Sequence, residues 1–409
     1  MSFYYSYMGT KRSIASTIAL RMEELQPGPL LDLFAGMSAV GAAVMPKRQV
    51  WCNDVQHYAH QVAQSLFVDG RGAPFENYKD ALTEEFDKQL KYLKARLSAL
   101  VALEQSALNG PSLTVLAELE RLIASSRMDG VLARLRDQGK KGGARARYSV
   151  ITACYGGGYF SLLQAAEIDA ARCAVEALWK EAVIGEIERR RLLVAMGRAM
   201  ASVSNSTGHF AQYLTIKADN LKRCLQTRRR SFFKEWISAI GLIQPHQTAD
   251  FRRRNRAIQS DALSLLSTLR DRRTRPAVIY ADPPYTSDQY SRYYHVLETL
   301  ILYDFPDVKG KGMYRDDRYA SEFSTNTKVE RSFKALIRDA AEIGADLVIS
   351  YPEKGLLETP LESIPDFLRD HFARIEPVTE IPHLHSTLGA SKGVQKAVVK
   401  EFVFIGRLR

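Results

Sequence analysis

The stretch LLDLFAGMSAVG, residues 30–41, determines the fold class that we expect. Its apolar start is typical of a short buried strand that carries one acid, Asp32, and its glycines are typical of a tight turn into a helix. A second short apolar strand at 50–52 runs into Asn53 and Asp54. This series of strand, glycine turn, helix and strand followed by an acid predicts an α/β fold, with a Rossmann-like sheet covered by helices on both faces.

A long helical segment interrupts this pattern. Apolar residues recur at helical spacing through 83–137, and residues 159–239 also favour helices. Short apolar strands return at 257–260, 277–281, 345–351 and 397–405. The simplest architecture is therefore one α/β domain, residues 1–80 and 256–409, interrupted by a mostly helical domain at 81–255.

The composition indicates an ordinary globular protein with a cationic surplus. Of the 409 residues, 46% are hydrophobic and 25% charged, which excludes a disordered chain, a collagen and a disulfide-rich mini-protein. The formal net charge of +11 favours a polyanionic partner. No apolar run reaches the length of about 18 residues that a membrane span needs, and the four cysteines lack metal-ligand spacing. We therefore expect a cytoplasmic protein with reduced cysteines and without a metal or a membrane partner.

The tetrapeptide DPPY, residues 282–285, is the sharpest chemical signal. It directly follows the expected strand at 277–281, and parallel α/β sheets bind their ligands beyond the carboxyl ends of their strands. Two prolines make the turn rigid, because each fixes φ and removes a donor. Asp282 and the Pro283 carbonyl can then accept two N–H bonds from an exocyclic amine while Tyr285 stacks on its ring. The alternative interpretation is a structural turn that only ends the strand.

Several further segments suggest a cofactor that contains a nucleoside. The turn at Gly36 brings backbone N–H groups to a helix N-terminus, although such turns also bind dinucleotides, and a Met-Ser pair stands where a second glycine is usual. Asp54 ends the second strand and suits ribose hydroxyls, and Asp261 ends the third and suits an adenine amine. The segment YMGTK at 7–11 suits a cofactor carboxylate. Read alone, the acids are equally well explained as helix caps or loop acids, and the segment as a surface loop.

Together these motifs resemble those of the alpha-group N6-adenine DNA methyltransferases, the Dam-like group. YMGTK, DLFAG, Asn-Asp after the second strand, Ser-Asp after the third and DPPY after the fourth stand in that group's order. In that group a target-recognition domain separates the first cofactor strands from DPPY, as the insertion at 81–255 does here. Further matching stretches lie at 155–165, 203–210, 285–299 and 397–406.

The resemblance implies an enzyme that transfers a methyl group from S-adenosylmethionine to N6 of an adenine flipped out of double-stranded DNA. It implies that Lys11, Asp32, Phe34 and Gly36 contact the methionine moiety, Asp54 the ribose and Asp261 the adenine amine. The full set that we expect at the cofactor is Tyr7, Met8, Gly9, Lys11, Asp32, Phe34, Ala35, Gly36, Asp54 and Asp261. The set that we expect at the target base is Asp282, Pro283, Pro284 and Tyr285.

Cationic runs in and around the insertion are the candidate DNA contacts, although charge runs are often only solvated surface. The residues that we expect there are Arg145, Arg147, Arg228, Arg229, Arg230, Arg252, Arg253 and Arg254. A cognate restriction endonuclease is a candidate partner. Two alternatives stay open: methylation of another amine (cytosine N4, an RNA adenine or a protein glutamine), and a catalytically silent DNA-binding homologue. The recognition sequence and the oligomeric state have no signature in the chain.

Overall fold

The computed structural model describes residues 11–45, 47–110, 112–385 and 397–409. The chain divides into two compact units. The α/β unit comprises the described residues up to Asp69 together with Pro245–Ser291 and Tyr319–Arg409. The helical unit comprises Gly70–Gln244 and Arg292–Arg318.

The described part of the α/β unit contains one sheet of eight strands in the order β3-β2-β1-β4-β7-β10-β8, with β9 paired to β10. The strands are β1 (Leu30–Asp32), β2 (Val50–Asp54), β3 (Arg256–Gln259), β4 (Val278–Ala281), β7 (Asp346–Pro352), β8 (Arg374–Ile375), β9 (Thr379–His385) and β10 (Ala397–Arg407). β1 to β4 and β7 are parallel, whereas β10 is antiparallel to β7, β8 and β9. The expected Rossmann-like sheet is confirmed.

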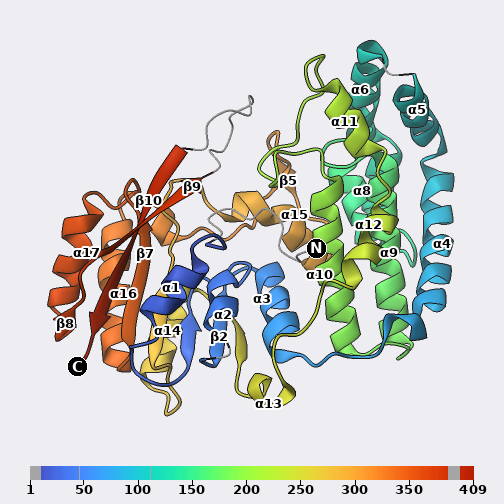
Figure 1. Ribbon diagram of the computed structural model, residues 1–409. Helices are drawn as coiled ribbons and strands as arrows, with labels where there is room; N and C mark the ends of the chain where they lie inside the picture. The colour runs from blue at the N-terminus through green and yellow to red at the C-terminus, as the bar shows by residue number, and fades with distance from the viewer. Residues whose placement is uncertain (1–10, 46, 111, 386–396) are drawn as a thin grey trace. The chain divides into compact units, whose positions relative to one another are not determined.

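Helices cover both faces of this sheet (Figure 1). They are α1 (Ala15–Arg21), α2 (Ala39–Val44), α3 (His57–Ala63), α13 (Ala249–Arg252), α14 (Ala262–Arg270), α16 (Val329–Ile343) and α17 (Pro360–Arg369), with short turns η1 (Gln64–Val68) and η3 (Glu322–Ser324). Because successive strand residues point to opposite faces, Leu31 and Ile279 pack in one core with α14, α16 and α17. Their neighbours Leu30 and Val278 pack in the other core with α1 and α2.

The helical unit is arranged around α9. Its elements are η2 (Phe75–Asn77), α4 (Lys79–Arg96), α5 (Ser98–Asn109), α6 (Leu113–Asp129), α7 (Val131–Lys140), α8 (Val150–Tyr155), α9 (Leu162–Lys180), α10 (Glu186–Val203), α11 (Leu221–Arg228), α12 (Phe232–Ile240), α15 (Ser291–Leu302) and the hairpin β5 (Val308–Lys309) and β6 (Tyr314–Arg315). Helix α9 contacts α4, α8, α10 and α12 (Figure 1). It begins at a capping box, in which the Ser161 hydroxyl accepts from the Gln164 N–H and the Gln164 side chain accepts from the Ser161 N–H.

The two units divide the chain differently from the boundaries that we expected. Residues 70–80 belong to the helical unit, where the backbone N–H of Ala73 donates to Glu188 on α10. Residues 292–318 also belong to it, although they follow the DPPY segment, and Tyr303 there donates to Asp169 on α9 at 2.6 Å. The insertion therefore includes a second, later segment of the chain.

Two simpler expectations concern cysteines and membrane spans. All four cysteines are buried and are not joined in disulfides. Among the described helices, none has the length and apolar character needed to cross a membrane.

Candidate active site

The carboxyl ends of β1, β2 and β4 border a pocket in the α/β unit. Strand β1 lies between β2 and β4. The chain continues from β1 to β2 on one side, whereas β4, on the other side, comes much later in the sequence. This is the switch point at which open α/β sheets bind ligands. Eight of the residues that line the pocket were predicted site residues: Lys11, Asp32, Phe34, Ala35, Gly36, Asp54, Asp282 and Pro284.

The glycine turn after β1 is held by Asp54. Its carboxylate accepts from the backbone N–H of Gly36 and from that of Gln56, each at 2.9 Å. Gly36 has φ of +49° and Ser38 has φ of +58°, a left-handed conformation that glycine adopts readily and serine does not. The Met-Ser pair thus adopts a tight turn that a second glycine would adopt with less backbone strain. Asp54 thus shapes the pocket wall that it lines.

Asp32 is a buried acid with unused hydrogen-bonding capacity. Its side chain is 1% exposed. One carboxylate oxygen accepts from the Gly41 N–H at 3.3 Å, and the other has no hydrogen-bond partner among the described residues. Burial raises the pKa of Asp32 to about 7, and the nearby charges of Asp282 and Asp54 add to the shift. An oxygen of this kind at a pocket wall can accept a hydrogen bond from a cationic donor.

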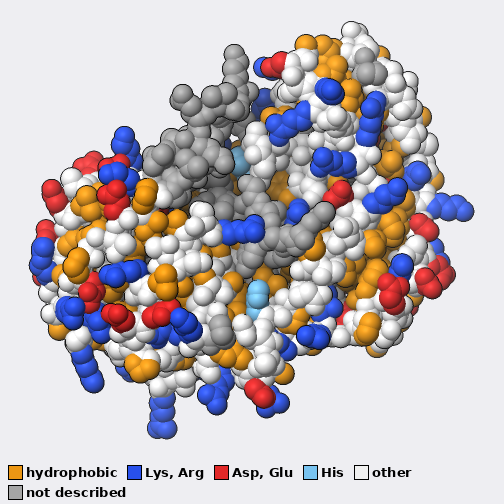
Figure 2. Space-filling model, in the orientation of Figure 1, with side chains coloured by type: hydrophobic (Ala, Val, Ile, Leu, Met, Phe, Trp, Pro, Cys, Tyr) orange, Lys and Arg blue, Asp and Glu red, His pale blue; other side chains and the backbone are white. Residues whose placement is uncertain are grey.

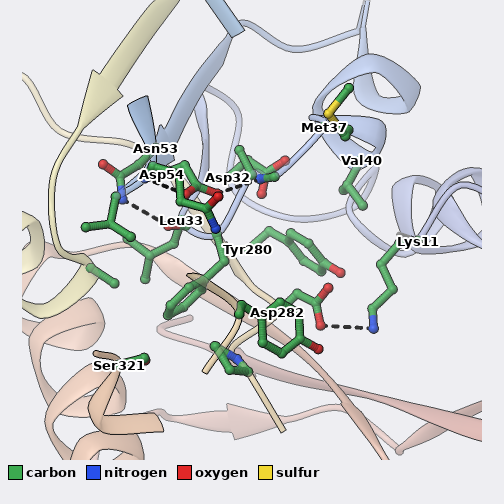
Figure 3. A pocket seen from close by; sticks show the side chains of 18 of the residues that line it. Lys11, Asp32, Leu33, Met37, Val40, Asn53, Asp54, Tyr280, Asp282 and Ser321 are labelled. Carbon is green, nitrogen blue, oxygen red and sulfur yellow. Dashed lines mark hydrogen bonds and ion pairs between the residues drawn. The ribbon is translucent and has the colours of Figure 1, made fainter. Parts of the chain in front are cut away.

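Asp282 stands at the proline corner after β4 and pairs with Lys11. Their oxygen and Nζ atoms are 2.9 Å apart, and the same Nζ lies 2.9 Å from a carboxylate oxygen of Glu401 on β10. Figure 3 shows Lys11 and Asp282 pointing toward one another beside Tyr280. Burial raises the pKa of Asp282 to about 7, which Lys11 opposes and Glu401 reinforces. Burial alone would lower the pKa of Lys11, but the two carboxylates raise it.

The aromatic part of the corner is Tyr285. Its ring contacts Tyr290 edge to face, with centroids 6.3 Å apart, and Lys11 Nζ lies 5.7 Å from the ring centroid. Its backbone carbonyl accepts from the Leu356 N–H at 3.0 Å. Pro283 is buried and Pro284 lines the pocket. The four residues of the tetrapeptide therefore form a corner that the surrounding chain holds in place.

Asp261 already has partners in the structure. It caps α14 by accepting from the Ser264 N–H at 2.9 Å, and it also accepts from the Tyr319 hydroxyl. Burial acts to raise the pKa of Asp261, but these hydrogen bonds lower it. Ser260, beside it, lines the pocket together with Tyr319 and Ser321. The helix-cap alternative for Asp261 is thus present in the geometry, and Asp261 itself does not line the pocket.

Among the residues that sequence reasoning missed are Asn53 and Tyr319, which line the pocket, and Glu401, which pairs with Lys11. Asn53 is buried and its amide donates to the carbonyls of Leu33 and Ser260 at 3.0 and 3.1 Å, so it ties two strand ends together. Asn53 directly precedes Asp54 at the end of β2, and this position could have identified it as a site residue from the sequence. Tyr319 and Glu401 carried no local signal, because their partners lie far away in the chain.

The predicted DNA-contact arginines fall into two groups. Arg228 and Arg252 are buried, which contradicts a role on a DNA surface. Arg228 donates to the Gly157 carbonyl and faces Glu104, and Arg252 donates to the carbonyls of His246 and Gln247. The other six are exposed: Arg145, Arg147, Arg229, Arg230, Arg253 and Arg254. Figure 2 shows lysine and arginine side chains spread over the visible face of the molecule.

Two remaining predictions concern the N-terminal segment and metals. Tyr7, Met8 and Gly9 lie outside the described residues. Within the described ranges, no three His, Cys, Asp or Glu side chains are grouped as a metal site.

Curated relatives carry modification-methylase names. The chain is 22% identical over 373 residues to Modification methylase LlaI of Lactococcus lactis subsp. lactis, covering 89% of this chain and 48% of that protein. It is 29% identical over 208 residues to Type II methyltransferase M.FokI of Planomicrobium okeanokoites, covering 50% and 29%. It is 29% identical over 209 residues to Type II methyltransferase M.NlaIII of Neisseria lactamica, covering 50% and 55%. The chain thus spans about half or less of the length of these relatives.

A family model agrees with the resemblance that the motifs indicated. The model described as D12 class N6 adenine-specific DNA methyltransferase matches residues 7–135 and 232–349, which together make up more than half of the chain. The matched ranges include the glycine turn, Asp54, Asp261 and the corner at Asp282. The chain therefore belongs to the D12 class N6 adenine-specific DNA methyltransferases.

Proposed function

We propose that the protein transfers a methyl group from S-adenosylmethionine to N6 of an adenine that is flipped out of double-stranded DNA. One observation carries this proposal. The rigid corner with Asp282 borders the same pocket as Asp32, Gly36 and Asp54, so a base on the corner and a cofactor on the glycine turn would lie next to each other.

The donor set of the pocket fits S-adenosylmethionine. The Asp32 oxygen that has no hydrogen-bond partner within the described ranges suits the α-ammonium group of the methionine part, because a charged donor forms the stronger kind of hydrogen bond. The carboxylate of Asp54, at the end of β2, suits ribose hydroxyls, and the left-handed turn at Gly36 allows close approach of the ligand. S-adenosylmethionine, when bound, supplies an electrophilic methyl group on a sulfonium centre.

The corner at Asp282–Tyr285 binds and orients the target base. Flipping the base costs a few kcal/mol, and stacking on Tyr285 returns about 1–3 kcal/mol. The Asp282 carboxylate and the Pro283 carbonyl accept hydrogen bonds from the two N–H groups of the adenine amine. These hydrogen bonds favour the pyramidal nitrogen that is needed for attack on the methyl group. These acceptors also stabilise the positive charge that develops on that nitrogen. Orientation and electrostatics thus provide the catalysis.

The helical unit is the proposed source of DNA contacts, through the exposed arginines Arg145, Arg147, Arg229 and Arg230. Exposed Arg253 and Arg254, in the α/β unit, are proposed to contribute phosphate contacts as well. Two of the similar proteins have names of type II methyltransferases, and on this basis we propose a cognate restriction endonuclease as a biological partner.

The test is single-turnover transfer of labelled methyl groups by the wild type and by Asp282→Ala and Asp282→Asn. Both variants are expected to lose at least about 100-fold in rate, the typical effect of removing one transition-state contact, while the cofactor Kd stays within about threefold. Equal loss of cofactor binding and transfer would mean that the corner only supports the fold. Tyr285→Phe, which keeps the ring, serves as the matched control and should retain most of the rate.

The same experiment separates the rival acceptors. Digests of methylated duplex DNA should contain label in N6-methyladenine. Label in N4-methylcytosine, in RNA or in protein would replace adenine in duplex DNA as the proposed substrate. Cofactor binding without transfer to any acceptor would identify a silent DNA-binding homologue.

A further inference from the structure

A buried chain of polar side chains runs from the sheet to the Asp282 corner. The Ser350 hydroxyl on β7 donates to the same oxygen of Glu401 that pairs with Lys11. Lys11 then contacts Asp282 at 2.9 Å. Exposed fractions are 2% for Glu401, 7% for Lys11 and 14% for Asp282. Glu401 does not line the pocket that Asp282 and Lys11 border.

The charge balance among Glu401, Lys11 and Asp282 is unusual for a structural ion pair. Burying a charge is expensive, and one acid is sufficient to neutralise one lysine. Here the buried carboxylate of Glu401 and the partly buried carboxylate of Asp282 share one ammonium group. Since Lys11 divides its attraction between them, Asp282 receives less stabilisation as an anion than it would in an exclusive pair.

We infer that Glu401 is a positioning residue, which draws Lys11 partly away from Asp282 so that the Asp282 carboxylate stays a strong and available acceptor for the target amine. The inference rests on the proposed function of Asp282. The pairing of β10 with β7 explains the rigidity of the arrangement: Val403 lies opposite Ser350, and Glu401 and Val403 point to the same face of the sheet. Ser350 is therefore placed to hold the Glu401 carboxylate.

Removing the charge of Glu401 has a defined electrostatic consequence. Lys11 would then pair with Asp282 alone, and an exclusive cationic partner lowers the pKa of a carboxyl group. The other groups that act on or sense Asp282 are Asp32, Tyr280 and Tyr285. Glu401 also acts on Tyr280 and Tyr285, but burial holds the pKa of both phenols above the ordinary value of 10, and Glu401 is not among the charges that act on Asp32. A shift of a midpoint near neutral pH would therefore report on the contact of Glu401 with Lys11 and Asp282.

The experiment is the pH dependence of single-turnover methyl transfer to duplex DNA at saturating cofactor, for the wild type, Glu401→Gln and Glu401→Asp. In the wild type the rate should rise as Asp282 ionises. Glu401→Gln should move the midpoint of this rise down by about one pH unit, within the range that a neighbouring charge produces, and should lower the plateau rate about 10- to 100-fold. The cofactor Kd should change less than threefold. Glu401→Asp, which keeps the charge, should recover part of the rate and the original midpoint.

Matched controls keep the test decisive. Glu380→Gln removes an exposed carboxylate that pairs with Lys400 on the neighbouring strand, and it should leave rate and midpoint unchanged. Ser350→Ala disturbs Glu401 more gently and should give a smaller change in the same direction, which keeps the test usable if Glu401→Gln does not fold. An unchanged midpoint in folded Glu401→Gln or in Ser350→Ala, while the wild type methylates adenine, would overturn this inference alone. A wild type that methylates no adenine would overturn the proposed function instead.

Discussion

At the scale of the residue, Asp32 shows how a binding site is built at the expense of stability. Its raised pKa means that the folded state binds the proton more tightly than the unfolded state, for which the ordinary value is near 3.8. The ionised form is therefore destabilising. This penalty is absent below the unfolded pKa, grows as pH rises from about 4, and is complete above about 7.

We predict that Asp32→Asn stabilises the protein at pH 8 and weakens cofactor binding. The amide keeps an acceptor for the Gly41 N–H but removes the buried charge. The gain should be roughly 1–3 kcal/mol, the cost of an unsatisfied buried group, and it should shrink toward pH 5. Thermal unfolding at both pH values and calorimetric titration with S-adenosylmethionine measure the two effects. A stability gain of equal size at both pH values would contradict the role assigned to ionisation.

Individual residues were predictable where they directly follow a strand. Asp32 and Asp282 sit at strand ends, and the parallel sheet brings such ends together. Glu401 was not predictable, because its contact with Lys11 depends on pairing between strands that lie hundreds of residues from Lys11 in the chain. The arginine runs gave two wrong predictions, since charge alone does not distinguish an exposed Arg229 from a buried Arg228.

At the scale of the element, a single acid organises part of the helical unit. Asp169 on α9 accepts from the backbone N–H groups of Ile151 and Thr152 at the start of α8, and from the Tyr303 hydroxyl just after α15. Burial raises the pKa of Asp169 to about 6, although its hydrogen bonds oppose the shift. Three segments distant in sequence therefore depend on one carboxyl group.

Asp169→Ala should destabilise the helical unit, because it leaves three buried donors without their acceptor. The expected loss is roughly 2–4 kcal/mol, measured as a lower midpoint of chemical unfolding and as faster amide exchange at the start of α8. Asp87→Ala, which removes an exposed acid on α4, is the control and should change little. Unaltered exchange at Ile151 and Thr152 would argue against the proposed anchor.

Elements with strong periodicity were predicted well, and connections were not. Strands at 277–281 and 345–351 correspond closely to β4 and β7, because fully buried strands are continuous apolar runs. The helical spacing of apolar residues was expected only as far as residue 137, yet α7 extends to Lys140. The apolar contacts of α7 outweigh the effect of its charges on secondary structure.

At the scale of the whole molecule, the surplus of +11 predicts salt-sensitive DNA binding. Each phosphate contact contributes about 0.9 to the slope of log K against log salt concentration. Replacing both Arg145 and Arg147 by Gln should lower the slope by about 2 and weaken binding to all sequences alike. The measurement is a salt series of DNA affinities by fluorescence anisotropy.

The matched control for this prediction is replacement of Arg272 and Arg273 by Gln. Both are exposed in the α/β unit, and the change in net charge is identical. The control slope should stay near that of the wild type. Equal effects of the two pairs would mean that overall charge, and not the surface of the helical unit, governs binding.

The shared lysine has a consequence for the order in which the protein is synthesised. Lys11 and Asp282 leave the ribosome well before Glu401, and until β10 has joined β7 the ammonium group has only one acid to neutralise. A nascent chain of that length already contains the glycine turn and the proline corner. Translation thus supplies the two motifs first and the second carboxylate afterwards. Under the role proposed for Glu401, Asp282 becomes a fully effective acceptor only when the sheet is complete.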